Sequence, residues 1–171
     1  MDPETYGTLL VYIATLTALA VAGCAPVISR GSLREVDQGV RFEHLLKNPP
    51  AYRGRTVLLG GDIIETQNLP GKTLLVVLQR SLGFRGRPAA EGASKGRFIV
   101  CVPGFLDPAI YRPTRKVTVV GSVSGKEVRP LGEIEYTYPV ITKRELYIWP
   151  LEGSPAAQPR VRFGVGVGVG L

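Results

Sequence analysis

Hydrophobic and polar positions divide the chain into an apolar N-terminal stretch, one short helical pattern and a series of strand patterns. Residues 40–47 place apolar side chains at Phe42, Leu45 and Leu46, which is the spacing of an amphipathic helix. The Asn-Pro-Pro at 48–50 ends this helix, because proline lacks the N–H donor that a further turn needs. The pattern therefore predicts one short helix ahead of the strands.

Strand patterns occupy most of the chain after this helix. They predict strands at 56–64, 72–78, 97–102 and 116–123, followed by one long bent strand or two short ones over 133–149, interrupted at Pro139. Gly60 and Gly61 lie inside the first strand and predict a bulge or a strong bend there. Residues 68–71 predict a hairpin turn, and 83–96 a long loop rich in Gly, Pro, Ala and Arg.

These elements predict a mainly β protein. Five or six strands, one short N-terminal helix and mid-strand glycines that permit tight curvature fit a small closed or partly open OB-like barrel. In the fourth strand, Val117, Val119 and Val123 share one face, as a barrel core requires. An open sandwich is the alternative.

The apolar stretch at the N-terminus covers Leu9 to Ala22, which is 14 residues. As a helix it would rise about 21 Å at 1.5 Å per residue, whereas the hydrocarbon layer of a bilayer is about 30 Å thick. Its length favours the apolar part of an export signal. An uncleaved buried helix or a short membrane anchor is the alternative. Met1-Asp2-Pro3-Glu4 is acidic where a signal is normally basic, so either the start differs or the signal is atypical.

The apolar stretch ends in Val21-Ala22-Gly23-Cys24, which resembles the lipobox of bacterial lipoproteins. The resemblance implies cleavage between Gly23 and Cys24, a lipid on the Cys24 thiol and fatty acids such as palmitate. Ala25 rather than Asp follows the cysteine, and by resemblance to lipoprotein sorting this implies transport to the outer membrane. Residues 1–23 are thus the predicted signal peptide and 24–36 a lipidated tether.

Positive charge dominates the rest of the chain. Lys and Arg number 21 against 14 acids, a net charge of +7 that becomes +9 without residues 1–23. This excess suits an anionic partner, either a lipid surface or a nucleic acid. An exported protein meets lipid phosphates, so we expect anionic lipid or another envelope protein and no nucleic acid. The residues expected to contact such a surface are Arg80, Arg85, Arg87, Arg97, Arg112, Arg115 and Lys116.

Candidate catalytic and metal-binding residues are few. His44 is the single histidine, and a zinc site usually needs three or four ligands, so no metal or other cofactor is expected. Cys101 lies in an apolar run and is interpreted as a buried structural thiol. Glu133 and Glu135 would share one side of a strand and could form an acid–base pair, as in a cell-wall hydrolase, although such spacing is common on solvated strands. No enzyme activity is expected.

Several phrases in order resemble the Slp family of Gram-negative outer membrane lipoproteins, the starvation-inducible type. They are Gly96-Arg97-Phe98, Gly104-Phe105-Leu106-Asp107-Pro108 with Tyr111, Val117-Thr118-Val119-Val120-Gly121, Gly132-Glu133 with Tyr136-Thr137-Tyr138-Pro139-Val140, and Trp149-Pro150. The resemblance implies a non-enzymatic lipoprotein that faces the periplasm and stabilises the envelope, or binds there, under starvation or other stress. The family supplies no catalytic residues to transfer.

Residues 37–150 are therefore expected to form one Slp-like β-barrel domain. Residues 151–171 form a Pro/Gly/Val-rich tail that ends in alternating Gly and Val, interpreted as flexible, with an added strand or membrane-touching segment as the alternative. Two other functions stay open from the sequence: an envelope enzyme such as a cell-wall hydrolase, and an OB-type module that binds single-stranded nucleic acid.

Overall fold

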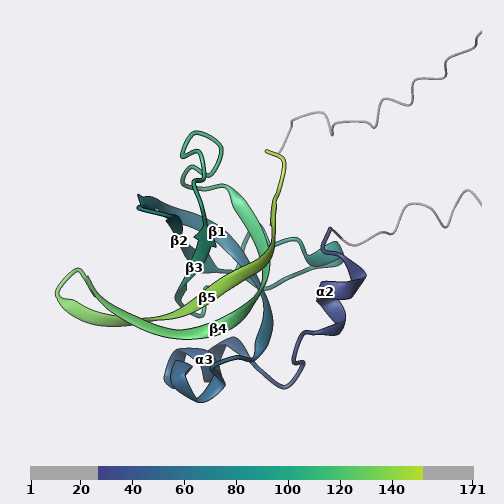
Figure 1. The fold of residues 1–171 in the computed structure, drawn as a ribbon, viewed down its shortest axis with the longest axis horizontal. Coiled ribbons are helices and arrows are strands. Elements are labelled where there is room, and N and C mark those ends of the chain that lie inside the picture. Colours follow the sequence, from purple (N-terminus) through teal and green to yellow (C-terminus); the bar gives the residue numbers. More distant parts are fainter. Residues whose placement is uncertain (1–26, 152–171) are drawn as a thin grey trace, which may run out of the picture.

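A computed structural model describes residues 27–151 of the chain. Five strands form a closed barrel, and a short helix lies below one end of it (Figure 1). The strands are β1 (Thr56–Leu69), β2 (Lys72–Gln79), β3 (Arg97–Pro103), β4 (Lys116–Leu131) and β5 (Ile134–Ile148), and the helices are α2 (Arg30–Arg34) and α3 (Phe42–Lys47), with 3₁₀ turns η2 (Pro49–Tyr52) and η3 (Phe84–Gly86). The predicted signal, Cys24 and the Gly-Val tail lie outside the described residues.

The strand order around the barrel is β1-β2-β3-β5-β4, with β4 returning to β1. All neighbours are antiparallel except β3 and β5, which run parallel over the three pairs Ile99↔Val140, Val100↔Ile141 and Cys101↔Thr142. A five-stranded barrel closed in this order is the OB-like arrangement, so the predicted fold is confirmed. Because β3 and β5 are paired, the sheet closes into a barrel, and the alternative of an open sandwich is wrong.

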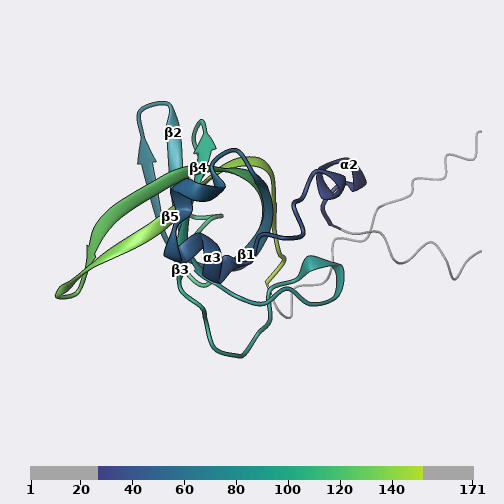
Figure 2. The ribbon, with the colours of Figure 1, turned by 90° about the horizontal axis from the view of Figure 1, so that it is seen from below.

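Alternating inward side chains fill the barrel. Phe98, Val100 and Val102 of β3 lie in the main core with Val117, Val119 and Val123 of β4, so the predicted shared face of β4 is confirmed. Helix α3 adds Phe42 and Leu45 to this core, and the Phe42 ring meets the Phe98 ring edge-on at 5.9 Å between centroids. Figure 2 looks at the end of the barrel that α3 covers.

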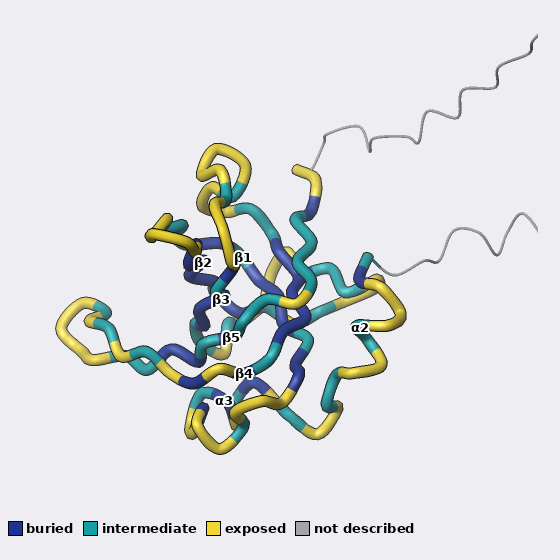
Figure 3. Tube along the Cα trace, viewed as in Figure 1, coloured by how far each residue is buried: buried dark blue, intermediate teal, exposed yellow. Residues whose placement is uncertain are grey.

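A second, smaller cluster lies outside the barrel wall. Leu74, Val76, Ile99 and Tyr138 are buried there, because the far part of the β4–β5 hairpin folds against β2 and β3. Cys101 packs against this cluster and is only partly buried, so the expectation of a buried thiol is wrong. Burial is concentrated on the barrel strands, while loops and the hairpin tip are exposed (Figure 3).

Several predicted element boundaries were wrong. Strand β4 continues past Val123 to Leu131, and β1 continues past Ile64 to Leu69. The single long strand, one of the two predicted alternatives for 133–149, is confirmed as β5, but it is not interrupted at Pro139, which pairs with Lys126. Proline is tolerated there because β5 pairs with β3 only from Val140 onward, so one side of the strand is an edge at this point. The irregularity of β1 lies between Ile63 and Glu65 rather than at Gly60 and Gly61.

The segment expected to be a tether contains a helix in its described part. Ser29 caps α2 by accepting a hydrogen bond from the Ser32 N–H, and Ile28 is buried. The Ser29 N–H and hydroxyl both donate to the Glu145 carboxylate of β5, at 2.9 and 2.8 Å. This contact holds the start of the described chain against the barrel. No helix in residues 27–151 has the length and hydropathy to cross a bilayer.

Candidate functional site

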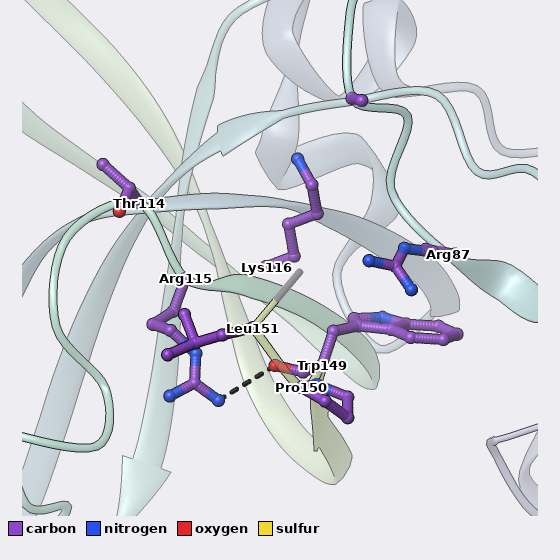
Figure 4. Close-up of a pocket in the computed structure, with 8 residues that line it drawn as sticks. Arg87, Thr114, Arg115, Lys116, Trp149, Pro150 and Leu151 are labelled. Atoms are coloured by element: carbon purple, nitrogen blue, oxygen red, sulfur yellow. Dashed lines mark hydrogen bonds between the residues drawn. The ribbon is translucent and has the colours of Figure 1, made fainter. Parts of the chain in front are cut away.

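A pocket of about 250 Å³ opens where the end of β5 meets the start of β4 (Figure 4). Its lining consists of Arg87, Ala90, Thr114, Arg115, Lys116, Trp149, Pro150 and Leu151. Three of the expected basic residues therefore share one pocket, although they come from two separate segments of the chain. The lining holds three cationic side chains and no carboxylate.

Trp149 forms the aromatic wall of the pocket. Its backbone N–H donates to the Lys116 carbonyl at 2.9 Å, and its indole N–H donates to the Thr118 hydroxyl at 2.9 Å. The ring is buried, and the Arg87 guanidinium carbon lies 5.2 Å from its centroid, within cation–π range. Trp149 is not among the site residues predicted from the sequence.

Arg115 is held by backbone carbonyl groups. Its Nη2 donates to the Trp149 carbonyl at 2.9 Å and its Nη1 to the Ile110 carbonyl at 3.3 Å. Among the described residues, its Nε is the one buried side-chain polar atom without a hydrogen-bond partner. This donor is an exception, since buried polar groups are normally hydrogen-bonded.

Lys116 and Arg80 share a carboxylate that the sequence analysis missed. Asp62 of β1 accepts from Arg80 Nε at 2.7 Å and from Lys116 Nζ at 3.1 Å, and all three side chains are at most one-fifth exposed. Arg80 also donates to the Gly92 carbonyl at 2.5 Å. Arg80 is therefore engaged inside the structure, and the Asp62 carboxylate offsets part of the charge that Lys116 brings to the pocket.

The other expected basic residues lie elsewhere. Arg85 lies in η3 and lines a separate cavity of about 170 Å³ with Ile28 and Leu33. Arg97 lines a groove on the outer cluster with Arg129, and Arg112 is exposed in the loop before β4. The seven residues thus form no single surface. Gly23 and Cys24 lie outside the described residues.

The candidate catalytic groups are not assembled into a site. Glu133 lies in the β4–β5 turn and Glu135 on β5, both exposed, so the expected shared strand face is wrong for Glu133. His44 is exposed, and its ring stacks on the Tyr52 ring with 6.5 Å between the centroids. Within residues 27–151, no group of three His, Cys, Asp or Glu side chains could hold a metal ion.

This arrangement is suited to binding a small anionic group. Phosphate or carboxylate oxygens would accept from the guanidinium group of Arg87 or of Arg115, which lie apart in Figure 4, and an apolar portion would contact Trp149. The pocket lining supplies no nucleophile paired with a base.

The model of the Slp family of outer membrane lipoproteins matches residues 21–164. The chain belongs to the Slp family. The match includes the whole barrel, both basic segments and the four residues Val21-Ala22-Gly23-Cys24. The resemblance seen in the sequence is therefore confirmed.

Two curated relatives match this Slp-family chain. The uncharacterized lipoprotein YeaY of Escherichia coli is 31% identical over 150 residues, covering 86% of this chain and 76% of its own length. An uncharacterized protein of Haemophilus influenzae is 37% identical over 98 residues, covering 57% of this chain and 53% of its own length.

Solved structures with some similarity include two crystal structures of the mitochondrial single-stranded DNA-binding protein of S. cerevisiae. Their TM-scores are 0.35 and 0.33 at 14% and 13% sequence identity, and each covers 56% of this chain and 94% of the other. The OB-like fold of this Slp-family chain follows instead from its own strand order and barrel closure.

Proposed function

We propose that the protein is an outer membrane lipoprotein acylated at Cys24, with its barrel in the periplasm. The observation that carries the proposal is the family match, which starts at residue 21 and so includes the lipobox-like Val21-Ala22-Gly23-Cys24. Cleavage before Cys24 would remove the apolar stretch at Leu9–Ala22, leaving the acyl chains as the anchor.

Acyl chains hold such a protein firmly. Each buried CH₂ group contributes about 0.8 kcal/mol, so more than one chain gives stable anchoring where a single chain does not. Ala25 supports delivery to the outer membrane, because an Asp at this place would by resemblance signal retention at the inner membrane. Residues 27–151 form the barrel domain that this anchor would carry.

We infer a binding or envelope-stabilising role under starvation or other stress rather than catalysis. The pocket at Arg87, Arg115 and Lys116 supports binding, because its cations and aromatic wall complement an anionic group. Anionic lipid and another envelope protein are the partners that we propose. The stress role rests on the family resemblance alone.

The two cysteines of the chain give a matched test of the anchor. Cells producing wild-type, Cys24→Ser or Cys101→Ser protein are labelled with radioactive palmitate and fractionated. We expect label and outer membrane recovery for wild type and Cys101→Ser, and neither for Cys24→Ser. Globomycin, which blocks lipoprotein signal peptidase, should cause the uncleaved form to accumulate.

The location of the barrel is tested separately. Protease added to intact cells should spare the protein, while protease added after outer membrane permeabilisation should digest it. Palmitate label on the Cys24→Ser protein would contradict the acylation site. Digestion in intact cells would contradict the periplasmic orientation.

A further inference from the structure

The turn η3 presents an exposed phenylalanine at its tip. Phe84 is 77% exposed, which is unusual for a large apolar side chain, and Arg85 follows it in the left-handed region at φ 59°. Non-glycine residues adopt that conformation at an energetic cost, so the surrounding structure must hold it. The solvent-facing position of Phe84 is thus imposed by the fold.

Hydrogen bonds fix the turn on the barrel. The Thr118 hydroxyl donates to the Gly86 carbonyl at 2.7 Å, and the Gly83 N–H donates to the Arg87 carbonyl at 2.8 Å. Thr118 is buried in β4, so the base of the turn is attached to the barrel wall. Phe84 therefore projects from a fixed support.

The same face carries the start of the described chain. Ile28 and Leu33 line a cavity with Arg85 and Gly86, so the start of the described chain and α2 lie beside η3. Ile28 follows Cys24 by four positions, and four extended residues span at most roughly 14 Å. An acyl anchor at Cys24 would bring this face of the barrel close to the bilayer.

The charge of this face suits anionic lipid. Arg30 and Arg34 of α2 are exposed, and Arg85 is exposed in η3. Cations near a membrane surface are attracted by anionic headgroups, and an aromatic ring between them can enter the interface. The acidic Glu35 of the same segment is paired with Arg144.

We propose that η3 and α2 form a membrane-contact surface, in which Phe84 enters the lipid interface while Arg30, Arg34 and Arg85 meet lipid phosphates. This proposal rests on acylation of Cys24, and it adds a fixed orientation of the barrel relative to the bilayer. Phe105, 72% exposed in the loop after β3, provides the matched comparison, because Gly104 is bonded to Gly71 at the β1–β2 turn, away from α2.

The test uses the full, acylated chain reconstituted in phosphatidylethanolamine vesicles with or without phosphatidylglycerol, both containing brominated acyl chains. Phe84→Trp and Phe105→Trp are compared with the parent, whose single tryptophan, Trp149, is buried and gives the baseline. Mass spectrometry of the same samples establishes whether Cys24 is acylated. We expect bromine quenching and a blue-shifted emission for Phe84→Trp, whereas Phe105→Trp should emit at longer wavelength, as a solvent-exposed tryptophan does, without quenching beyond that of the parent.

A charge variant tests the cations. Arg30→Gln with Arg34→Gln in the Phe84→Trp chain should lower the equilibrium constant for contact with phosphatidylglycerol vesicles, as reported by quenching, by roughly tenfold or more. Arg41→Gln with Lys47→Gln removes the same charge from two exposed positions, the N-cap and the last residue of α3, and should leave quenching unchanged. Raising the salt concentration should reproduce the effect of the α2 variant.

Three outcomes would overturn the proposal, each in a different way. An acylated chain in which Phe105→Trp is quenched and Phe84→Trp is not overturns the proposed orientation but leaves the anchor intact. If neither position is quenched in an acylated chain, the proposed orientation is also overturned. The η3 face would then be exposed to the periplasm, where a protein partner could bind it. A chain without the acyl group overturns both the anchor and the orientation that rests on it.

Discussion

The Trp149 indole N–H donates to the Thr118 hydroxyl at 2.9 Å, and both residues are buried. The same hydroxyl donates to the Gly86 carbonyl at 2.7 Å. One side chain of β4 therefore joins the residue after β5 to the turn that carries Phe84. The pocket wall and the proposed membrane-contact surface share this support.

Thr118→Val keeps the shape of the side chain and removes the hydroxyl. We expect a loss of about 1–3 kcal/mol in the free energy of unfolding, because the buried indole N–H and the Gly86 carbonyl lose their partner. Urea unfolding of the mature chain, followed by circular dichroism, measures it. Thr137→Val, on a partly exposed part of β5, should change stability by less than about 0.5 kcal/mol. Equal losses for both variants would contradict the linking role of Thr118.

The barrel was predictable because its strands are runs of β-branched and aliphatic residues bounded by turn residues. The predicted starts at 56, 72, 97 and 116 agree with β1 to β4, since β-branched residues begin abruptly after turn residues. The ends agree less well. Residues 124–131 include Lys126, Glu127 and Arg129 and show no apolar face, yet they continue β4 because β5 pairs with them as a two-stranded hairpin. The β5 half of this hairpin carries alternating Ile134, Tyr136, Tyr138 and Val140, but its β4 half carries no such pattern, so the extension of β4 was not visible in the sequence.

The site was predictable only in its charge. A basic surface follows from composition, but Asp62 is 54 residues from Lys116, and their contact depends on the pairing of β1 with β4. The exposure of Phe84 has no sequence signal either, because an aromatic residue in a loop is as often buried. Arg30 and Arg34 were overlooked because residues 25–36 show no strong periodicity.

The mid-strand glycines permit close approach of neighbouring strands. A Cβ built on Gly121 would collide with the Thr142 carbonyl oxygen and lie 2.8 Å from the Ile141 side chain. Gly121→Ala should therefore destabilise the protein by at least about 2 kcal/mol, since backbone atoms of β5 would have to move. Thermal unfolding measures the loss.

Gly31 of α2 provides the control for this substitution. Its added Cβ would meet only the Ser29 hydroxyl oxygen, at 4.0 Å, so Gly31→Ala should be neutral or stabilising by up to about 1 kcal/mol. If Gly121→Ala lost no more stability than Gly31→Ala, the close packing of β4 on β5 would not need a glycine.

Asp62 is expected to stabilise the barrel beside the pocket. Asp62→Asn leaves Arg80 and Lys116 without their carboxylate, and we expect a loss of about 1–3 kcal/mol, below the roughly 3–5 kcal/mol of a fully buried pair because the group is 18% exposed. Glu127→Gln removes a more exposed partner, that of Arg129, and should cost about 0–1 kcal/mol. Chemical denaturation compares the two variants. Indistinguishable unfolding midpoints would show that solvent screens the Asp62 pairs as strongly as it screens the exposed Glu127 pair.

The contact between Ser29 and Glu145 should make the docking of α2 depend on pH. Partial burial acts to raise the pKa of Glu145, but hydrogen bonds from Ser32 and Ser29 outweigh it and hold the pKa below its ordinary value of 4.5. Because the folded-state pKa is lowered, the stabilisation is present above pH 4.5 and is lost as the pH falls through the folded value. At neutral pH the contact is therefore complete.

Amide chemical shifts and hydrogen exchange of Ser29 and Leu33, followed by NMR from neutral to acidic pH, measure this effect. We expect a transition with its midpoint below 4.5, and faster exchange at Leu33, whose N–H donates to the Ser29 carbonyl at 3.1 Å. Glu145→Gln should abolish the transition and loosen α2 at all pH values, whereas Glu133→Gln in the exposed turn should retain it. A transition that persists in Glu145→Gln would assign the pH dependence to another group. If α2 loosens without Glu145, the orientation of the barrel on the membrane should loosen too, because α2 connects η3 to the anchor.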